Sequence, residues 1–143
     1  MNHQPVLDVG RTAITDLSAL RSLDNLTELT LWNTSVRNLQ PLASLKKLEK
    51  LNLRDTRISD LHALQQMENL KELNIGYTNV MYLNPIASLY RLEKLDIRDT
   101  PVVNISPVSS LEHLRELILI DSKVENLMPL RFLRQQGRLQ VKL

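Results

Sequence analysis

The chain has 143 residues, of which 43% are hydrophobic and 24% are charged, a composition typical of a folded domain rather than of a disordered segment. A formal net charge of +2 is too small to indicate a nucleic-acid-binding surface, and the absence of cysteine excludes disulfide bonds and thiolate chemistry. No apolar run reaches the roughly 18 residues of a membrane span, and the first residues show no signal-peptide pattern. Because a chain without cysteine suits a reducing compartment, we expect a cytoplasmic protein.

A repeat of 22 residues runs along the chain. Leucine or isoleucine recurs at this spacing in two positions: Leu29, Leu51, Leu73, Leu95 and Leu117, and Leu31, Leu53, Ile75, Ile97 and Leu119. A hydroxyl residue follows at Thr34, Thr56, Thr78, Thr100 and Ser122. The repeats are 4–25, 26–47, 48–69, 70–91, 92–113 and 114–135, with a partial seventh at 136–143. We expect no insertion or deletion between them, and a single domain over residues 1–143.

The first part of each repeat predicts a short β-strand. Leu29 and Leu31 are separated by one polar residue, and an alternation of period two buries one face of a strand. The same alternation places the first strand at Leu7 and the last at Leu139 and Val141.

The second part of each repeat predicts a tight helical turn. Its apolar residues fall at every third position, as at Leu39 and Leu42, which matches a 3₁₀ helix. Proline begins this turn at Pro41, Pro85, Pro107 and Pro129. Asn84 and Ser106 precede two of these prolines, and we expect them to cap the turn. One strand and one short helix per repeat predict a right-handed coil whose parallel strands line the inner wall of an arc.

Each unit reads L-x-x-L-x-L-x-x-T-x-V-x-x-L-x-x-L-x-x-L-x-x, which resembles the leucine-rich repeat family in the 22-residue form of internalin-like bacterial proteins and phosphatase-regulator repeats. The resemblance covers nearly the whole chain. It implies an α/β repeat solenoid with a parallel sheet on the concave face and short 3₁₀ or helical turns on the convex face. The family usually has asparagine where this chain has Thr34 and its equivalents. A hydroxyl both donates and accepts, so it can do part of the work of that amide.

The two ends of the predicted stack carry no recognisable cap. Val9 begins the sheet almost at once, and Leu143 ends the chain on a strand. Phe132 replaces the polar or small residues of its position in the other repeats, and we expect it to fold over the end. An exposed sheet edge with apolar residues favours pairing. This leaves two interpretations, a protein that self-associates through its terminal strands or a piece of a longer chain.

Residues that flank the buried strand leucines face the concave side and form columns with one residue per repeat. The first column is Val6, Glu28, Lys50, Glu72, Lys94, Glu116 and Arg138. Its charges alternate from Glu28 onward, which predicts a ladder of cross-strand ion pairs. Cationic neighbours keep each glutamate ionised, so we expect no general acid in this column.

The next three columns hold the residues with most potential for contact. The second column is Asp8, Thr30, Asn52, Asn74, Asp96, Ile118 and Gln140; the third is Gly10, Trp32, Arg54, Gly76, Arg98, Ile120 and Lys142; the fourth is Arg11, Asn33, Asp55, Tyr77, Asp99, Asp121 and Leu143. Trp32, Arg54, Tyr77 and Arg98 are of the types that dominate interface energetics. We expect Gly76 to leave a shallow gap beside Tyr77.

The triplet Arg-Asp-Thr occurs at 54–56 and again at 98–100, 44 residues later. One interpretation is duplicated ancestry with local pairing of arginine and aspartate. The other is a pair of equivalent cationic contacts for a carboxylate or phosphate of a partner, since arginine offers a planar fork of donors. Both can hold at once.

Ile118 and Ile120 interrupt otherwise polar columns, and we expect both to be exposed. They reflect either the strand propensity of β-branched residues or a small apolar patch for a partner or a second copy of the chain. If they are exposed, Ile118→Glu is expected to leave folding nearly intact and to weaken association.

No constellation of residues predicts chemistry. The histidines do not cluster, serine, histidine and acidic residues form no triad-like arrangement, and the three glycines are isolated rather than grouped in a phosphate-binding loop. We therefore expect no catalytic residue, no metal site and no cofactor.

These observations predict a non-catalytic protein–protein interaction module that binds its partner through the concave strand face. The expected contacts are Trp32, Arg54, Tyr77, Arg98, Ile118 and Ile120. The alternatives are a structural segment that assembles through its terminal strands, which would make a homo-oligomer, and a recognition domain of a longer protein. Neither nucleic-acid binding nor a membrane span is expected.

Overall fold

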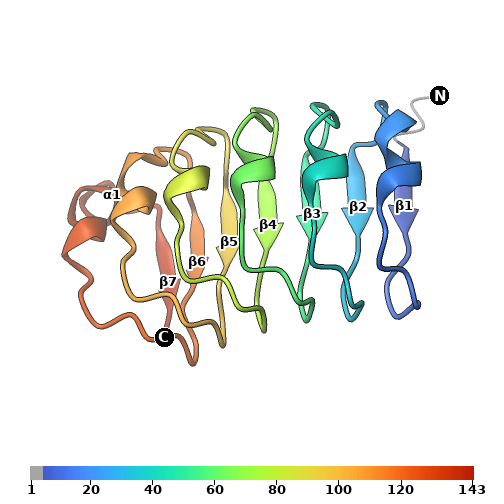
Figure 1. Cartoon of the computed structure of the whole chain (residues 1–143). Helices are drawn as coiled ribbons and strands as arrows, with labels where there is room; N and C mark the ends of the chain where they lie inside the picture. Colours follow the sequence, from blue (N-terminus) through green and yellow to red (C-terminus); the bar gives the residue numbers. More distant parts are fainter. Residues whose placement is uncertain (1–4) are drawn as a thin grey trace.

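A computed structural model describes residues 5–143, so residue 4 of the first predicted repeat and His3 lie outside the described residues. Seven strands form one sheet in chain order, and every neighbouring pair is parallel. The strands are β1 (Val6–Asp8), β2 (Glu28–Thr30), β3 (Lys50–Asn52), β4 (Glu72–Asn74), β5 (Lys94–Asp96), β6 (Glu116–Ile118) and β7 (Gln140–Lys142). Figure 1 shows them side by side along the molecule, from β1 near the N-terminus to β7 near the C-terminus.

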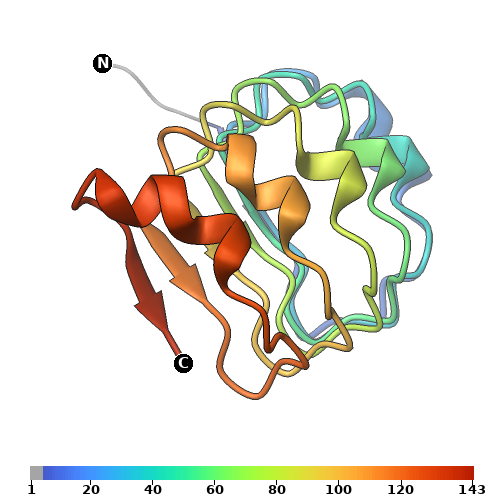
Figure 2. The same cartoon turned by 90° about the vertical axis from the view of Figure 1, so that its left-hand side faces the viewer.

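Short helical turns cover the side opposite the sheet, as Figure 2 shows. Six of them are 3₁₀ helices, at Ser18–Ser22, Gln40–Leu42, His62–Leu64, Asn84–Ile86, Ser106–Ser110 and Met128–Leu130. The last runs directly into α1 (Arg131–Gln135). One strand and one helical turn per repeat confirm the predicted α/β solenoid, with the sheet on one face and the turns on the other.

The core between these two layers consists mainly of the predicted leucines. Leu29 and Leu31 are both buried, as are their equivalents in the following repeats. The strands span only three residues each, so the second leucine lies just beyond the strand while its side chain still points inward. Each repeat buries its apolar side chains against its neighbours, which makes the stability of one repeat depend on the next.

The hydroxyl column, Thr34 and its equivalents, stabilises the turn after β1 to β5. After β6, the Ser122 hydroxyl instead accepts the backbone N–H of Val124 at 3.4 Å. Thr34, Thr56, Thr78 and Thr100 are buried, and each hydroxyl donates to the carbonyl oxygen three residues earlier at 2.6–2.8 Å. The strand therefore ends in a turn whose carbonyl group is satisfied inside the core, where water cannot replace the bond.

Thr78→Val is expected to lower the free energy of unfolding by about 1 kcal/mol, because it removes a buried hydrogen bond from a side chain of similar shape. Urea denaturation followed by circular dichroism measures the change. Thr12→Val is the matched control, since Thr12 makes the same bond to Val9 at 2.6 Å in an exposed setting. Equal losses at Thr78 and Thr12 would contradict the role of burial.

The caps of the 3₁₀ turns differ from the prediction. Asn84 and Ser106 are the first residues of their turns, and neither side chain caps them. The cap comes instead from an aspartate or asparagine that lies two residues before the first residue of the turn. The backbone N–H of that first residue donates to the Oδ1 of the aspartate or asparagine at 2.8–3.0 Å. The residues that do this are Asp16, Asn38, Asp60, Asn104 and Asn126. Tyr82 occupies the same position in repeat 70–91.

The last strand is shifted by two residues from the 22-residue spacing, so the expectation of no insertion is wrong here. Glu116 pairs with Gln140 and Ile118 with Lys142, whereas the spacing had paired them with Arg138 and Gln140. The two extra residues follow from α1. An α-helix rises about 1.5 Å per residue against about 2.0 Å for a 3₁₀ helix, so it needs more residues to span the same length. Gly137, at a φ of 73°, ends this helix in the left-handed conformation that glycine adopts without strain.

Phe132 does not fold over the end of the stack. Its side chain is 59% exposed on α1, while its neighbour Leu133 is buried against the core. In the preceding repeats Ser44, Ser88 and Ser110 occupy this position and donate to a backbone carbonyl of the repeat before, a bond that phenylalanine cannot make. No helix within residues 5–143 combines the length and apolar character needed to cross a membrane.

Candidate functional site: the strand face

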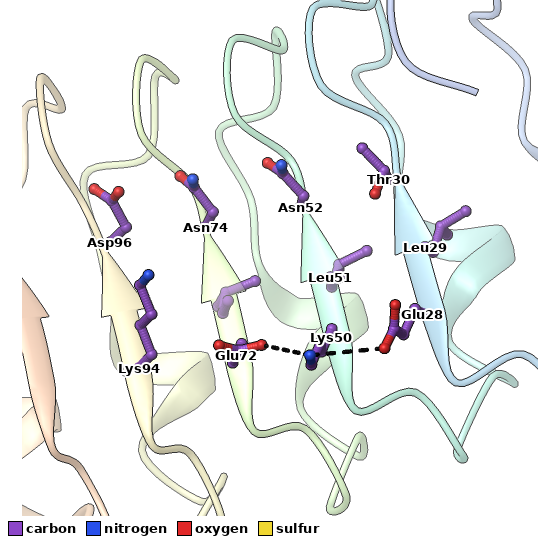
Figure 3. Close-up of a pocket in the computed structure, with 11 residues that line it drawn as sticks. Glu28, Leu29, Thr30, Lys50, Leu51, Asn52, Glu72, Asn74, Lys94 and Asp96 are labelled. Carbon is purple, nitrogen blue, oxygen red and sulfur yellow. Dashed lines mark ion pairs between the residues drawn. The ribbon is translucent and has the colours of Figure 1, made fainter. Parts of the chain in front are cut away.

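The outward side of the sheet, which we call the strand face, carries the first three columns. Figure 3 shows its central part, where Lys50 lies between Glu28 and Glu72. The Lys50 ammonium is 3.7 Å from Glu28 and 3.3 Å from Glu72. The hydrogen bond that Lys50 donates to Glu72, followed by the charges of both glutamates, raises the pKa of Lys50. The predicted ion-pair ladder is thus confirmed across β2, β3 and β4.

The ladder is not continuous beyond β4. Figure 3 shows the amino group of Lys94 turned toward Asp96 rather than toward Glu72. At the C-terminal end, Lys142 rather than the predicted Arg138 pairs with Glu116, at 2.9 Å, because of the two-residue shift of β7. The hydrogen bond from Lys142 lowers the pKa of Glu116.

Side-chain oxygens in the second column accept hydrogen bonds from nearby backbone N–H groups. Asp8, Asn52, Asn74 and Asp96 each accept, through Oδ1, the backbone N–H two residues ahead at 2.9–3.0 Å. Each asparagine has only one side-chain oxygen, and its NH₂ group is a further hydrogen-bond donor beside that oxygen. Thr30 makes no such bond within the described residues, and Ile118 has no acceptor with which to make one.

The fourth column has a left-handed backbone in every repeat that the structure describes. Its φ values lie between 49° and 57°, at Arg11, Asn33, Asp55, Tyr77, Asp99 and Asp121. Asparagine and aspartate tolerate this region, but it is strained for bulky residues. Tyr77 and Arg11 are therefore in an unfavourable backbone conformation.

Three of the predicted contacts lie together at the carboxyl ends of β2, β3 and β4. Trp32, Arg54 and Tyr77 line a hollow of about 460 Å³ together with Asn52, Asp55 and Asn74, and we call it the Trp32–Tyr77 hollow. The Arg54 guanidinium carbon lies 4.8 Å from the centre of the Tyr77 ring, within range of a cation–π interaction. On the other side, the guanidinium of Arg11 lies 5.7 Å from the centre of the Trp32 ring.

Gly10 explains how Trp32 can lie against the first repeat. A Cβ atom on Gly10 would overlap the Cδ1 and Nε1 edge of the indole ring. The missing side chain thus leaves room for the largest residue of the chain beside the sheet. This position of Trp32 leaves it partly buried and makes it a rigid wall of the hollow.

The fourth predicted contact, Arg98, forms an ion pair with a neighbouring aspartate. Its Nε donates to both carboxylate oxygens of Asp96, at 3.1 and 3.0 Å, and Asp96 is only 3% exposed. The hydrogen bond with Asp96 raises the pKa of Arg98. The Arg98 stem also fills the expected gap, because a Cβ on Gly76 would lie 3.0 Å from Arg98 Cγ. The predicted shallow gap at Gly76 is therefore absent.

The prediction that Ile118 is exposed is wrong. Its side chain is 2% exposed, and Ile120 is half-buried. Ile118 does point to the strand face, but its strand partners are Asp96 and Lys142. Asp96 is held under Arg98, and Lys142 reaches to Glu116, so long aliphatic stems flank the isoleucine and cover it. Ile118 is thus buried rather than the exposed apolar residue that the sequence predicted.

Several residues of interest escaped the sequence analysis. Asn52, Asn74 and Asp55 line the hollow but were not among the predicted contacts, although their places in the columns beside Arg54 could have identified them. Repeat 70–91 also contains all three tyrosines of the chain, at positions where the other repeats have polar residues. Of these, Tyr82 is 69% exposed beside the exposed Met81, on a loop outside the strand face.

Within residues 5–143, no three side chains of histidine, cysteine, aspartate or glutamate come together as a metal site would need. His62, the first residue of its 3₁₀ helix, bonds to Asp60, and His113, in a turn, bonds to the carbonyl oxygen of Tyr90; both lie away from the strand face. The strand face itself carries aromatic side chains, side-chain amides and the guanidinium groups of Arg54 and Arg98.

No protein-family model matches the chain, and no curated protein matches it. Solved structures are similar to it. An internalin from Listeria monocytogenes is 24% identical with a TM-score of 0.73, and the match covers 96% of this chain and 46% of the internalin. Internalin C2 from the same organism is 29% identical with a TM-score of 0.78, covering 96% of this chain and 70% of that one.

A leucine-rich repeat protein from Leptospira interrogans is 18% identical with a TM-score of 0.84, covering 96% of this chain and 36% of that one. The chain thus spans about half the length of the first internalin and about a third of the Leptospira protein. The parallel sheet, the 3₁₀ turns and these three likenesses agree with the resemblance seen in the repeat. The chain is a leucine-rich repeat solenoid.

Proposed function

We propose that the chain is a non-catalytic module that binds a partner protein through its strand face, at the Trp32–Tyr77 hollow. The likeness to leucine-rich repeat proteins supports an interaction module in general. The observation that carries the finer proposal is the hollow itself, which gathers Trp32, Arg54 and Tyr77 from three successive repeats into one concave surface. Aromatic residues and arginine in a recessed position are the side chains that contribute most to protein–protein affinity.

The surroundings of the hollow suit a protein surface better than a small substrate. The groove beside it, over β2 to β5, has a volume of about 230 Å³ and is open along the sheet. Its floor carries the paired charges of Lys50 and Glu72 and the amides of Asn52 and Asn74. Such a polar rim around an aromatic centre is the usual layout of a protein interface.

Trp32→Ala and Arg54→Ala are expected to weaken partner binding by about tenfold or more each, as for interface residues worth at least about 1.4 kcal/mol. The partner is first recovered from the source cell with the unmodified chain and purified. Its affinity for each variant is then measured by isothermal titration calorimetry. Tyr90→Ala is the matched control, since Tyr90 is an exposed aromatic residue outside the hollow. Unchanged affinity for both variants would overturn the proposal.

A second candidate function is self-association through the outer strands. Within residues 5–143, β1 and β7 are each paired on one side, and Val6 in β1 and Leu143 after β7 are strongly exposed. An unpaired strand beside exposed apolar side chains favours addition of another strand. Sedimentation velocity over a range of protein concentrations tests this candidate. A sedimentation coefficient that stays at the monomer value throughout would rule it out.

A further inference from the structure

The two Arg-Asp-Thr triplets are chemically different sites, although their sequences are identical. In the second triplet, Arg98 is neutralised by the buried carboxylate of Asp96. In the first, the residue two positions before Arg54 is Asn52, which is neutral. Among residues 5–143, no carboxylate lies within ion-pair distance of Arg54, and its guanidinium lies over the Tyr77 ring instead. The hollow thus holds a positive charge that the chain itself does not neutralise.

The other polar groups of the hollow add to its donor character. The Oδ1 atoms of Asn52 and Asn74 accept the backbone N–H groups of Arg54 and Gly76 at 3.0 and 2.9 Å. Their NH₂ groups have no such partner, so they offer donors next to the guanidinium. The one carboxylate in the lining, Asp55, is exposed, and water therefore screens its charge.

Resting on the proposed function above, we propose that the Trp32–Tyr77 hollow binds the carboxylate of an acidic side chain of the partner protein. A carboxylate is planar and accepts two parallel hydrogen bonds from a guanidinium, which makes it the natural counterpart of Arg54. The amides of Asn52 and Asn74 donate further bonds to the same group or to the adjoining peptide. Trp32 and Tyr77 enclose the methylene groups of the acidic side chain and limit the access of water, which strengthens the ion pair.

The experiment uses the full chain labelled with ¹⁵N and two small probes, glutamate and glutamine, each blocked as N-acetyl amides. Two-dimensional NMR spectra follow the Arg54 Nε–H, the Trp32 indole N–H and the side-chain NH₂ signals of Asn52 and Asn74 during titration. We expect saturable shifts with the glutamate probe and none with the glutamine probe, because only the former carries a charge. Equal shifts with the two probes, or no shifts with either, would overturn the proposal.

Two variants make the test specific. Asn52→Asp places a carboxylate two residues before Arg54, as Asp96 lies two residues before Arg98, so it is expected to neutralise Arg54 in the same way. We expect this variant to bind glutamate about tenfold more weakly. Asp55→Asn removes the nearby carboxylate and is expected to strengthen it by about twofold to threefold, the effect of an exposed charge. Asparagine suits the left-handed backbone there, as at Asn33. Arg57→Gln changes an exposed arginine outside the hollow and is expected to leave binding unchanged.

The outcome separates this proposal from the proposed function. If Trp32→Ala abolishes partner binding but Asn52→Asp leaves glutamate binding unchanged, the module binds through the hollow and the acidic ligand is wrong. If the glutamate shifts occur as expected but Trp32→Ala leaves partner affinity intact, the hollow binds carboxylates and the partner uses another surface.

Discussion

Ile118→Ala is expected to lower the free energy of unfolding by about 2–4 kcal/mol, the cost of removing a buried isoleucine side chain and leaving a cavity. Ile118 is 2% exposed although it points to the strand face, because Asp96, Arg98 and Lys142 surround it. The loss is measured by urea denaturation monitored by circular dichroism. It follows that Ile118→Glu also destabilises the chain, contrary to the expectation from sequence.

Ile120→Ala is the matched control for this prediction. Ile120 has the same side chain two residues further along and is only half-buried, so we expect a smaller loss of stability than at Ile118. Equal stability of the Ile118→Ala variant and the unmodified chain would contradict the burial of Ile118. It would also restore the interpretation of this side chain as a contact for a partner.

Tyr77→Asn is expected to stabilise the fold while it weakens partner binding. Tyr77 has a φ of 56°, and a left-handed backbone costs a bulky residue about 1–2 kcal/mol, whereas asparagine tolerates it. The substitution also removes the cation–π contact with Arg54, which is worth about 0.5–1 kcal/mol at an exposed site. The difference predicts a net gain of about 0.5–1 kcal/mol in the free energy of unfolding, visible as a higher thermal midpoint.

The affinity for the partner is expected to fall about 30-fold in the same variant, the loss of an aromatic hot spot worth about 2 kcal/mol. Backbone strain clusters at functional sites, which is why we expect Tyr77 to matter more for binding than for folding. Tyr90→Asn is the control, since Tyr90 lies outside the hollow and has no left-handed backbone. A variant that loses stability and keeps its affinity would show that Tyr77 has a structural role only.

The sequence was sufficient to predict the solenoid, the parallel strand order and the hydroxyl column. Each of these depends on a pattern that repeats every 22 residues, so a single repeat already contains the information. Thr78 and its equivalents illustrate this, because the same bond to the carbonyl three residues earlier recurs in successive turns. The alternating charges of Glu28, Lys50 and Glu72 likewise follow from the pairing of equal positions.

What the sequence did not predict depends on departures from the repeat. The two-residue shift of β7 arises because the final turn continues into an α-helix, and the leucine spacing up to Leu133 gives no sign of it. The burial of Ile118 depends on how the long side chains of Arg98 and Lys142 lie across the sheet. The difference between Arg54 and Arg98 lies in one neighbour, Asn52 against Asp96, which the identical triplets conceal.

The central claim is that the strand face is the binding surface, and site-directed labelling tests it most directly. The chain has no cysteine, so a single introduced thiol can be modified with a bulky maleimide without side reactions. Lys50→Cys places the label on the strand face beside the hollow, and Gln66→Cys places it on an exposed site next to the 3₁₀ turn at His62–Leu64. We expect the label at position 50 to abolish partner binding and the label at position 66 to leave it intact. Full binding with position 50 labelled, together with loss of binding with position 66 labelled, would contradict the account.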